Sequence, residues 1–137
     1  MTKSINITYV PADCGSMLPG KSKAPDAFKQ IGIAQKLLDS GFSNVEEVDA
    51  LSAPAKFKVV EKSSNGVRNE EANLEVCQDV HASLIASLDK NADFQLILGG
   101  ECCMSPAIVS AFWDSELAKN PKARIGLIYV DADTDLY

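Results

Sequence analysis

The sequence predicts an α/β fold in which helices cover both faces of a mainly parallel sheet. Short apolar segments rich in β-branched residues alternate with longer stretches whose apolar residues recur every three or four positions. Each connection between successive apolar segments is long enough to hold a helix, and this favours parallel pairing with right-handed crossovers. We therefore expect one three-layer α/β/α sandwich domain over residues 1–137.

Each expected element has its own signal in the sequence. The first helical stretch carries apolar residues at three-and-four spacing and ends before Gly41, which suits a C-terminal cap. Asn69 is a residue type that begins helices, and two glutamates follow it. Residues 52–67 show no clear periodicity apart from a turn signal, so we assign them no element. The expected strands are residues 5–10, 45–48, 94–98 and 125–130, and the expected helices are residues 25–40, 70–89 and 105–118.

The last stretch of the chain carries the strongest functional signal. Residues 125–130 read IGLIYV, as expected of a strand buried on both faces, and three carboxylates follow at alternate positions, Asp131, Asp133 and Asp135. Like charges crowded at the end of a buried strand repel one another, and a bound cation turns that repulsion into attraction. Because hard divalent cations prefer carboxylate oxygens, we predict a metal site here. The alternative is a solvated acidic loop that merely ends a strand.

A second polar group ends the preceding strand. Gly99-Gly100-Glu101-Cys102 follows the apolar residues 94–98, and paired glycines allow a sharp turn or a close approach to a ligand. Ligands of open α/β sheets bind beyond the carboxyl ends of the strands, so we expect Glu101 and Cys102 at the same edge as the aspartates. Cys102 is either a thiolate ligand of the metal or a packed side chain, and the sequence leaves both open.

The loop before the first helix matches the phosphate-binding pattern G-x-x-x-x-G-K-S, from Gly15 to Ser22. In that motif backbone amides surround phosphate oxygens, and here Lys21 would contact the terminal phosphates and Ser22 a magnesium ion. The context fits in part, because a strand precedes the loop and a helix follows it, but Pro25 places the start of the helix several residues after Lys21. A nucleotide-binding protein is therefore the weaker alternative.

Composition excludes several classes of protein. The net charge of −6 and the absence of a basic run argue against a nucleic-acid surface and against binding to an anionic membrane. We expect no membrane span and no secretory signal, because no apolar run is long enough and no cleavage region follows the N-terminus. The four cysteines lack C-x-x-C spacing, so we expect reduced thiols and a cytoplasmic protein. His81 is the only histidine, which argues against a Ser-His or Cys-His nucleophile and predicts a packed, hydrogen-bonded side chain.

The residues around both polar motifs resemble the arginase/agmatinase (ureohydrolase) family. The stretches LILGGEC at residues 96–102 and YVDADTD at residues 129–135 are similar to the family's two N-terminal metal motifs, GGDH and D-A-H-T-D. The first strand, the loop with Gly15 and Pro19-Gly20, and the helix after it are similar as well. The resemblance covers nearly the whole chain, and it implies that the phosphate-loop match is a coincidence within the family's first loop.

The resemblance implies a function and a set of site residues. Family members use two manganese ions to activate a bridging hydroxide, which attacks the guanidinium carbon of an arginine-like substrate and releases urea. By this resemblance Asp131 would bridge two Mn²⁺ ions, and Asp133 would touch one of them. Asp135 and Cys102 would complete the coordination of the other ion. Glu101 would support these ligands without contacting the metal itself. The implied partner is a small guanidino or amidine substrate.

The chain departs from the family pattern at these ligands. Cys102 and Asp133 stand where the family has histidines, and Glu101 replaces an aspartate, so the site is more anionic and includes a soft thiolate. The family's second aspartate motif would lie beyond Tyr137, so we expect the N-terminal portion of a longer, truncated fold. No helix follows the last expected strand, so either a second copy in a homo-oligomer or the rest of a longer chain would cover it. Two functions stay open: a metal-dependent hydrolase of linear C–N bonds, or a catalytically inactive family member with a structural or regulatory role.

Overall fold

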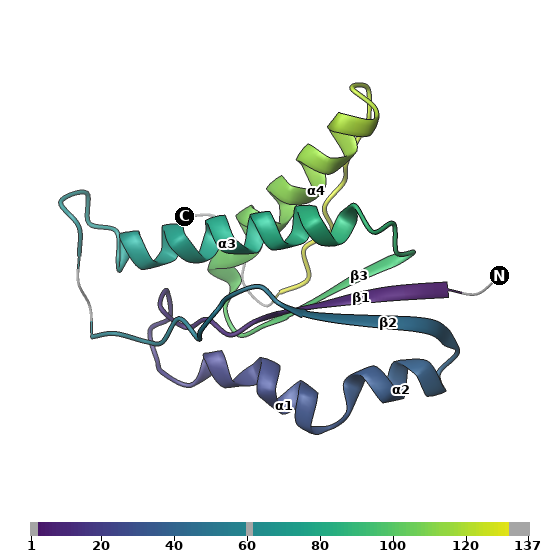
Figure 1. The fold of residues 1–137 in the computed structure, drawn as a ribbon. Coiled ribbons are helices and arrows are strands. Elements are labelled where there is room, and N and C mark those ends of the chain that lie inside the picture. The colour runs from purple at the N-terminus through teal and green to yellow at the C-terminus, as the bar shows by residue number, and fades with distance from the viewer. Residues whose placement is uncertain (1–2, 60–61, 132–137) are drawn as a thin grey trace.

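A parallel sheet forms the middle layer of the protein (Figure 1). The computed structural model describes residues 3–59 and 62–131. Within them the strands are β1 (Lys3–Val10), β2 (Phe42–Asp49) and β3 (Phe94–Gly99), and they lie in the order β2-β1-β3. Both pairings are parallel, as the helix-length connections predict. All three strands therefore point their carboxyl ends toward the same edge of the sheet.

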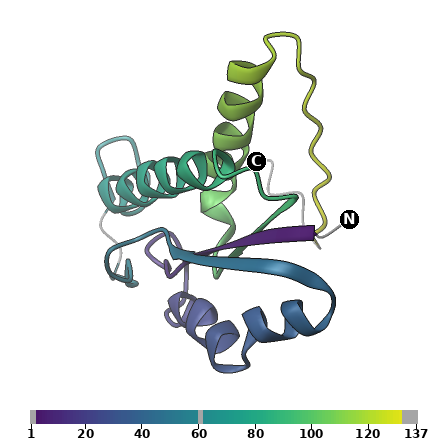
Figure 2. The same ribbon diagram turned by 45° about the vertical axis from the view of Figure 1, so that its right-hand side comes forward.

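Helices cover the sheet on both faces, which confirms the three-layer α/β/α sandwich (Figure 1). The short helices α1 (Ala24–Gln30) and α2 (Ile33–Asp39) lie on one face, and the longer helix α3 (Glu70–Leu88) lies on the other. Helix α4 (Ser105–Lys119) packs against α3, and its C-terminal end points away from the sheet (Figure 2). Across the described residues, no helix has both the length and the apolarity needed to cross a bilayer.

The central strand β1 contributes to the packing of both faces. Successive side chains of a strand point to opposite sides, and on one side Tyr9 lies beneath the Nζ of Lys29 from α1, 4.5 Å from the ring centroid. On the other side Asn6 donates from its Nδ2 to the carbonyl and the hydroxyl of Ser87 in α3, at 3.1 Å each. Further along, Val10 packs into an apolar cluster to which the two long helices contribute half of the buried residues. That cluster comprises Val10, Ala12, Cys14, Leu51, Val76, Val80, Leu84, Met104, Ala107 and Ala111.

The helix expected over residues 25–40 is two helices. Gly32 adopts φ +68, in the left-handed region, between the end of α1 and the start of α2. Glycine takes this conformation without steric cost, so the chain turns there and a second helix begins. Residues 52–67 form no helix or strand apart from isolated bridges within their described part, and the amide of Gly66 donates to the Ser63 carbonyl at 2.9 Å in the expected turn.

The strand expected over residues 125–130 is wrong. This segment returns from the tip of α4 toward the sheet as an extended chain, and among the described residues it forms no strand (Figure 2). Leu127, Ile128 and Val130 are 67%, 90% and 91% exposed. The side chains of Leu127 and Tyr129 line a cavity together with α4, so part of the apolar surface faces that helix and not the sheet. An apolar run indicates that a segment can be buried, but it does not indicate which surface of the protein covers that segment.

Candidate functional site

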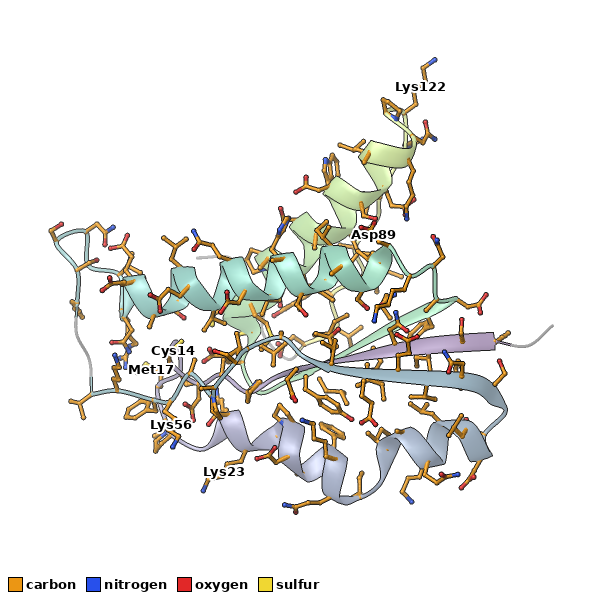
Figure 3. The ribbon with its side chains drawn as sticks, in the orientation of Figure 1. Cys14, Met17, Lys23, Lys56, Asp89 and Lys122 are labelled. Carbon is orange, nitrogen blue, oxygen red and sulfur yellow. The ribbon has the colours of Figure 1, made fainter. Side chains whose placement is uncertain are left out.

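Loops from all three strands meet at the carboxyl edge of the sheet, where Cys14, after β1, and Lys56, after β2, both lie (Figure 3). The loop after β1 runs beside the loop after β2, where Ala55 donates to the Pro11 carbonyl at 3.0 Å and Asp13 donates to the Ala55 carbonyl at 2.9 Å. The turn after β3 touches the loop after β1 from the other side, through Glu101. We call residues 11–23 the first loop. We call the three loops that follow β1, β2 and β3 at this edge, taken together, the rim.

Asp13 organises the first loop from inside. Its side chain is buried, with the residue 2% exposed, and its Oδ2 accepts hydrogen bonds from the Gly20 amide at 2.8 Å and from the Ser22 amide and hydroxyl at 3.3 and 3.0 Å. Its Oδ1 accepts one from the amide of Phe57, in the loop after β2. Burial alone would raise the pKa of Asp13, but these four hydrogen bonds favour the charged form and lower the pKa below its usual value.

Glu101 holds the other end of the first loop. It directly follows the two glycines after β3, is 9% exposed, and accepts hydrogen bonds from the Gly15 amide and the Ser16 hydroxyl at 3.1 Å each. The Cys14 thiol donates to its Oε1 at 3.8 Å, a weaker contact. A buried carboxylate needs such donors, and these three come from one segment of the neighbouring strand's loop. Glu101 therefore ties the end of β3 to the loop after β1.

Two glycines allow this close packing. A Cβ atom on Gly100 would lie 2.0 Å from the carbonyl oxygen of Lys21, which is a backbone atom that cannot move aside alone. A Cβ atom on Gly15 would lie 2.7 Å from both the Oδ1 of Asn73 and the Sγ of Cys103. The first loop thus lies directly against the Gly99-Gly100 turn, and glycine is required at residue 100, whereas a side chain on Gly15 would force Asn73 and Cys103 to move.

Three thiols lie near one another behind the rim, and two of them contact Asn73. The sulfurs of Cys14 and Cys103 each lie 3.5 Å from the Oδ1 of Asn73, and the Cys77 thiol donates to the Cys103 carbonyl at 3.8 Å. Burial, together with the nearby Glu101 carboxylate, raises the pKa of Cys14 to about 11 and raises the pKa values of Cys77 and Cys103. These thiols therefore stay protonated near neutral pH. All four cysteines of the chain are free, as the sequence predicts.

Cys102 occupies a different position from the other thiols. It begins the short 3₁₀ turn η2 (Cys102–Met104), and it is exposed, as the next residue Cys103 is, whereas Glu101 before it points inward. It lines two cavities. One, of about 320 Å³, lies along the end of β3 with Gly100 and Ile108. The other, of about 1040 Å³, lies between α4 and the segment that contains Tyr129.

The predicted metal ligands are only partly covered by the described residues. Cys102 lies at the expected edge of the sheet, and Asp131 is exposed in the extended segment, where the Tyr129 hydroxyl donates to its Oδ2 at 3.3 Å. Asp133 and Asp135 lie outside the described residues. No group of three or more histidine, cysteine or acidic side chains within residues 3–59 and 62–131 has the geometry to hold a metal ion. The four-residue ligand set therefore stays a prediction.

The phosphate-loop match has a different role in the structure. The amides of Gly20 and Ser22 donate to Asp13, and the amide of Gly15 donates to Glu101. In a phosphate-binding loop such amides would face the phosphate oxygens, but here carboxylates of the chain itself already accept their hydrogen bonds. The residues Lys21–Lys23 form a single 3₁₀ turn, η1, before α1 begins. This arrangement argues against the nucleotide-binding alternative.

His81 forms a contact between helices, as its position on the sequence predicts. Its Nε2 lies 2.9 Å from the Oδ2 of Asp114, which joins α3 to α4. Both side chains are partly exposed, and neither belongs to the rim.

Sequence reasoning misses the contacts of Asp13 in the rim and of Asn69 and Asn73 behind it. Asn69 suggests a helix cap, but its side chain makes no capping hydrogen bond, and its Nδ2 donates to the Cys14 carbonyl at 2.8 Å. Asp13 precedes the glycine-rich loop, and an acidic residue beside glycines is the one available signal for a carboxylate that binds loop amides. No sequence pattern around Asn73 indicates that its side chain contacts Cys14 and Cys103.

Comparisons with known proteins give one consistent family. A sequence model of the Arginase family matches residues 3–137. An arginase of Staphylococcus aureus is 28% identical over 134 residues, which cover 98% of this chain and 42% of that protein. An arginase of Agrobacterium fabrum is 27% identical over 137 residues, with 98% and 40% covered. The chain thus spans about two fifths of the length of the curated relatives it matches.

Solved structures show the same fold. The arginase of Entamoeba histolytica, determined in complex with L-ornithine, superposes with a TM-score of 0.70 at 15% identity, over 91% of this chain and 39% of that one. The arginase of Bacillus cereus superposes with a TM-score of 0.65 at 20% identity, over 82% and 35%. The three-strand sheet and its helices therefore correspond to one part of the arginase fold.

Proposed function

Because the chain belongs to the arginase family, we propose that it is the N-terminal portion of a metal-dependent hydrolase that cleaves linear C–N bonds of guanidino or amidine compounds. The observation that carries this proposal is the family match over residues 3–137, which includes both motifs that end in polar side chains. The relatives' name, arginase, suggests a substrate with a guanidino group and urea as a product. We propose a small molecule of that class as the partner.

The proposed metal is Mn²⁺, held by Cys102, Asp131, Asp133 and Asp135. The described residues do not fit a metal ion alone, because they bring together no group of three or more ligating side chains. The proposal therefore requires Asp131, Asp133 and Asp135 to come together beside Cys102. The exposure of Cys102 at the carboxyl edge supports this, because its sulfur is accessible while Glu101 faces the first loop.

Metal content and urea release test the proposal. The native polypeptide that contains residues 1–137 is purified, its metals are measured by mass spectrometry, and urea release is assayed with arginine, agmatine and other guanidino compounds. We expect bound manganese and urea release from at least one compound. Asp131→Asn should lower both, whereas Asp39→Asn, an exposed change in α2, should lower neither. A wild-type protein with no bound metal and no urea release would overturn the proposal.

A catalytically inactive family member is the second candidate. Two observations favour it: no metal-holding group occurs among the described residues, and neither Cys102 nor Asp133 supplies the imidazole that the family pattern has there. An inactive protein would keep the fold and lack both bound metal and urea release in the same assays. Restoring the imidazoles with Cys102→His and Asp133→His would then be expected to recover metal binding.

Two further properties belong to the same proposal. We propose a homo-oligomer, because the segment of residues 125–130 leaves Ile128 and Val130 exposed, and exposed apolar surface favours association. We also propose a cytoplasmic location, which four free thiols support. The native mass in solution tests the first proposal, and cell fractionation tests the second.

A further inference from the structure

We propose that Asp13 is a positioning residue for the hydrolytic site: it anchors Gly20 and Ser22 and thereby holds the first loop against the turn that presents Cys102. This inference rests on the proposed function, since it assigns Asp13 a role in the same reaction. Asp13 belongs to neither sequence motif that points to the metal. Its role emerges from the contacts of its buried carboxylate.

The carboxylate of Asp13 accepts hydrogen bonds from two different loops. Gly20 and Ser22 belong to its own loop, and Phe57 follows β2. Both oxygens of the carboxylate accept hydrogen bonds from these partners, and almost none of the residue is accessible to solvent. Asp13 therefore acts through the loops it binds, and it does not itself reach a metal or a substrate.

The anchored segment lies directly against the turn after β3. The carbonyl of Lys21, between Gly20 and Ser22, occupies the space that a side chain on Gly100 would need. Cys102, two residues after Gly100, is exposed and lines two cavities. A displacement of Lys21 would free the Gly100 backbone to shift, and that shift would move the Cys102 sulfur.

Glu101 restrains the first loop at a second point. Its carboxylate faces inward and binds Gly15 and Ser16, so the first loop is held at its beginning by Glu101 and at its end by Asp13. The inward direction of Glu101 leaves Cys102 facing outward. Catalytic groups lose much of their effect when they are misplaced by about 1 Å, so a rigid turn at this position matters for the rate.

Two variants and one control test the role of Asp13 in the native polypeptide that contains residues 1–137. Asp13→Asn keeps the size of the side chain but removes its charge and places an amide donor among backbone donors. Ser22→Ala removes a single hydroxyl donor and keeps the fold intact should the first variant fail to fold. Asp26→Asn, an exposed change in α1, is the matched control.

Two readouts are measured in parallel. The first is kcat and KM for urea release with manganese present. The second is the rate of Cys103 alkylation in metal-free protein, because Gly15 of the first loop packs against the Cys103 sulfur. We expect Asp13→Asn to lower kcat by roughly 10²-fold, with KM little changed because the substrate-binding groups are intact. Ser22→Ala should lower kcat less, and Asp26→Asn should change nothing. Cys103 alkylation should be faster only in the first two variants.

Each outcome decides the question. Faster Cys103 alkylation with an unchanged kcat would overturn the positioning role, because the loop would be loosened without effect on the reaction. Unchanged alkylation and unchanged kcat would show that Asp13 anchors nothing. An equal loss of activity in Asp26→Asn would indicate a general effect of charge and also overturn the inference. If the wild type neither binds manganese nor releases urea, the proposed function fails and the positioning role fails with it, while Cys103 alkylation still shows whether Asp13 anchors the loop.

Discussion

Two groups of carboxylates in this protein lie in different surroundings. Asp13 and Glu101 are buried, and their oxygens accept hydrogen bonds from the first loop and from Phe57. Asp131 is exposed at the end of a segment that makes no strand contacts in the described part of the chain. The buried pair therefore shapes the rim, whereas the exposed Asp131 is the residue that we propose as a metal ligand.

Burial explains why the two groups differ. A buried carboxylate is stable only when donors surround it, and the loops after β1 and β3 supply backbone amides at the required places. The segment of residues 125–130 packs only in part, against α4, and its aspartate lies in water. We therefore expect changes in the rim to cost stability and changes in the segment to cost little.

The largest contrast is expected between two glycines. Gly100→Ala places a Cβ atom 2.0 Å from the Lys21 carbonyl oxygen, whereas a Cβ atom on Gly126 meets nothing within 4 Å. Gly100→Ala should lower the free energy of unfolding by about 3 kcal/mol, because overpacking forces the backbone to shift. Gly126→Ala should change it by less than about 0.5 kcal/mol. Urea denaturation of both variants measures the difference, and equal effects would refute the contrast between rim and segment.

The next contrast compares one carboxylate from each group. Glu101→Gln leaves the shape unchanged but weakens the hydrogen bonds from Gly15 and Ser16, so it should cost about 2 kcal/mol of unfolding free energy. Asp131→Asn, in metal-free buffer, should change that free energy by less than about 0.5 kcal/mol, as an exposed substitution does. A larger cost at Asp131 than at Glu101 in urea denaturation would reverse our assignment.

The smallest expected effect is a pH dependence that belongs to Asp13. Its pKa is lowered in the folded state, so the unfolded state binds the proton more readily. The stability that Asp13 contributes is present above the usual aspartate pKa of about 4 and is lost as the pH falls through the lowered value. Urea midpoints measured between neutral pH and acid should therefore fall less steeply in Asp13→Asn than in Asp26→Asn. Parallel curves for these variants would rule out this contribution.

Sequence patterns predicted the layers of this protein better than its rim. Apolar runs and helical periodicity identified β1, α3, β3 and α4, because burial in a sheet or on one face of a helix requires apolar residues at a regular spacing. The break at Gly32 left only a weak signal, since an isolated glycine is tolerated inside a helix. The run at residues 125–130 has the composition of a buried strand, but composition does not identify a pairing partner.

The rim depends on contacts between residues far apart in the sequence, which no local pattern reports. Glu101 and Cys102 were expected at the carboxyl edge because the topology brings strand ends together, and both lie there. The direction of Glu101 toward Gly15 depends on where the first loop returns. The same holds for Asn73, which meets Cys14 and Cys103 only because α3 crosses that loop.

Manganese content of two variants tests the division between anchoring and ligating carboxylates most directly. Glu101→Gln and Asp131→Asn are prepared in the native polypeptide that contains residues 1–137, and bound manganese and metal-free stability are measured on the same samples. The account predicts that Asp131→Asn loses manganese and keeps its stability, whereas Glu101→Gln loses stability and still binds manganese once folded. Loss of manganese in Glu101→Gln with full retention in Asp131→Asn would contradict it.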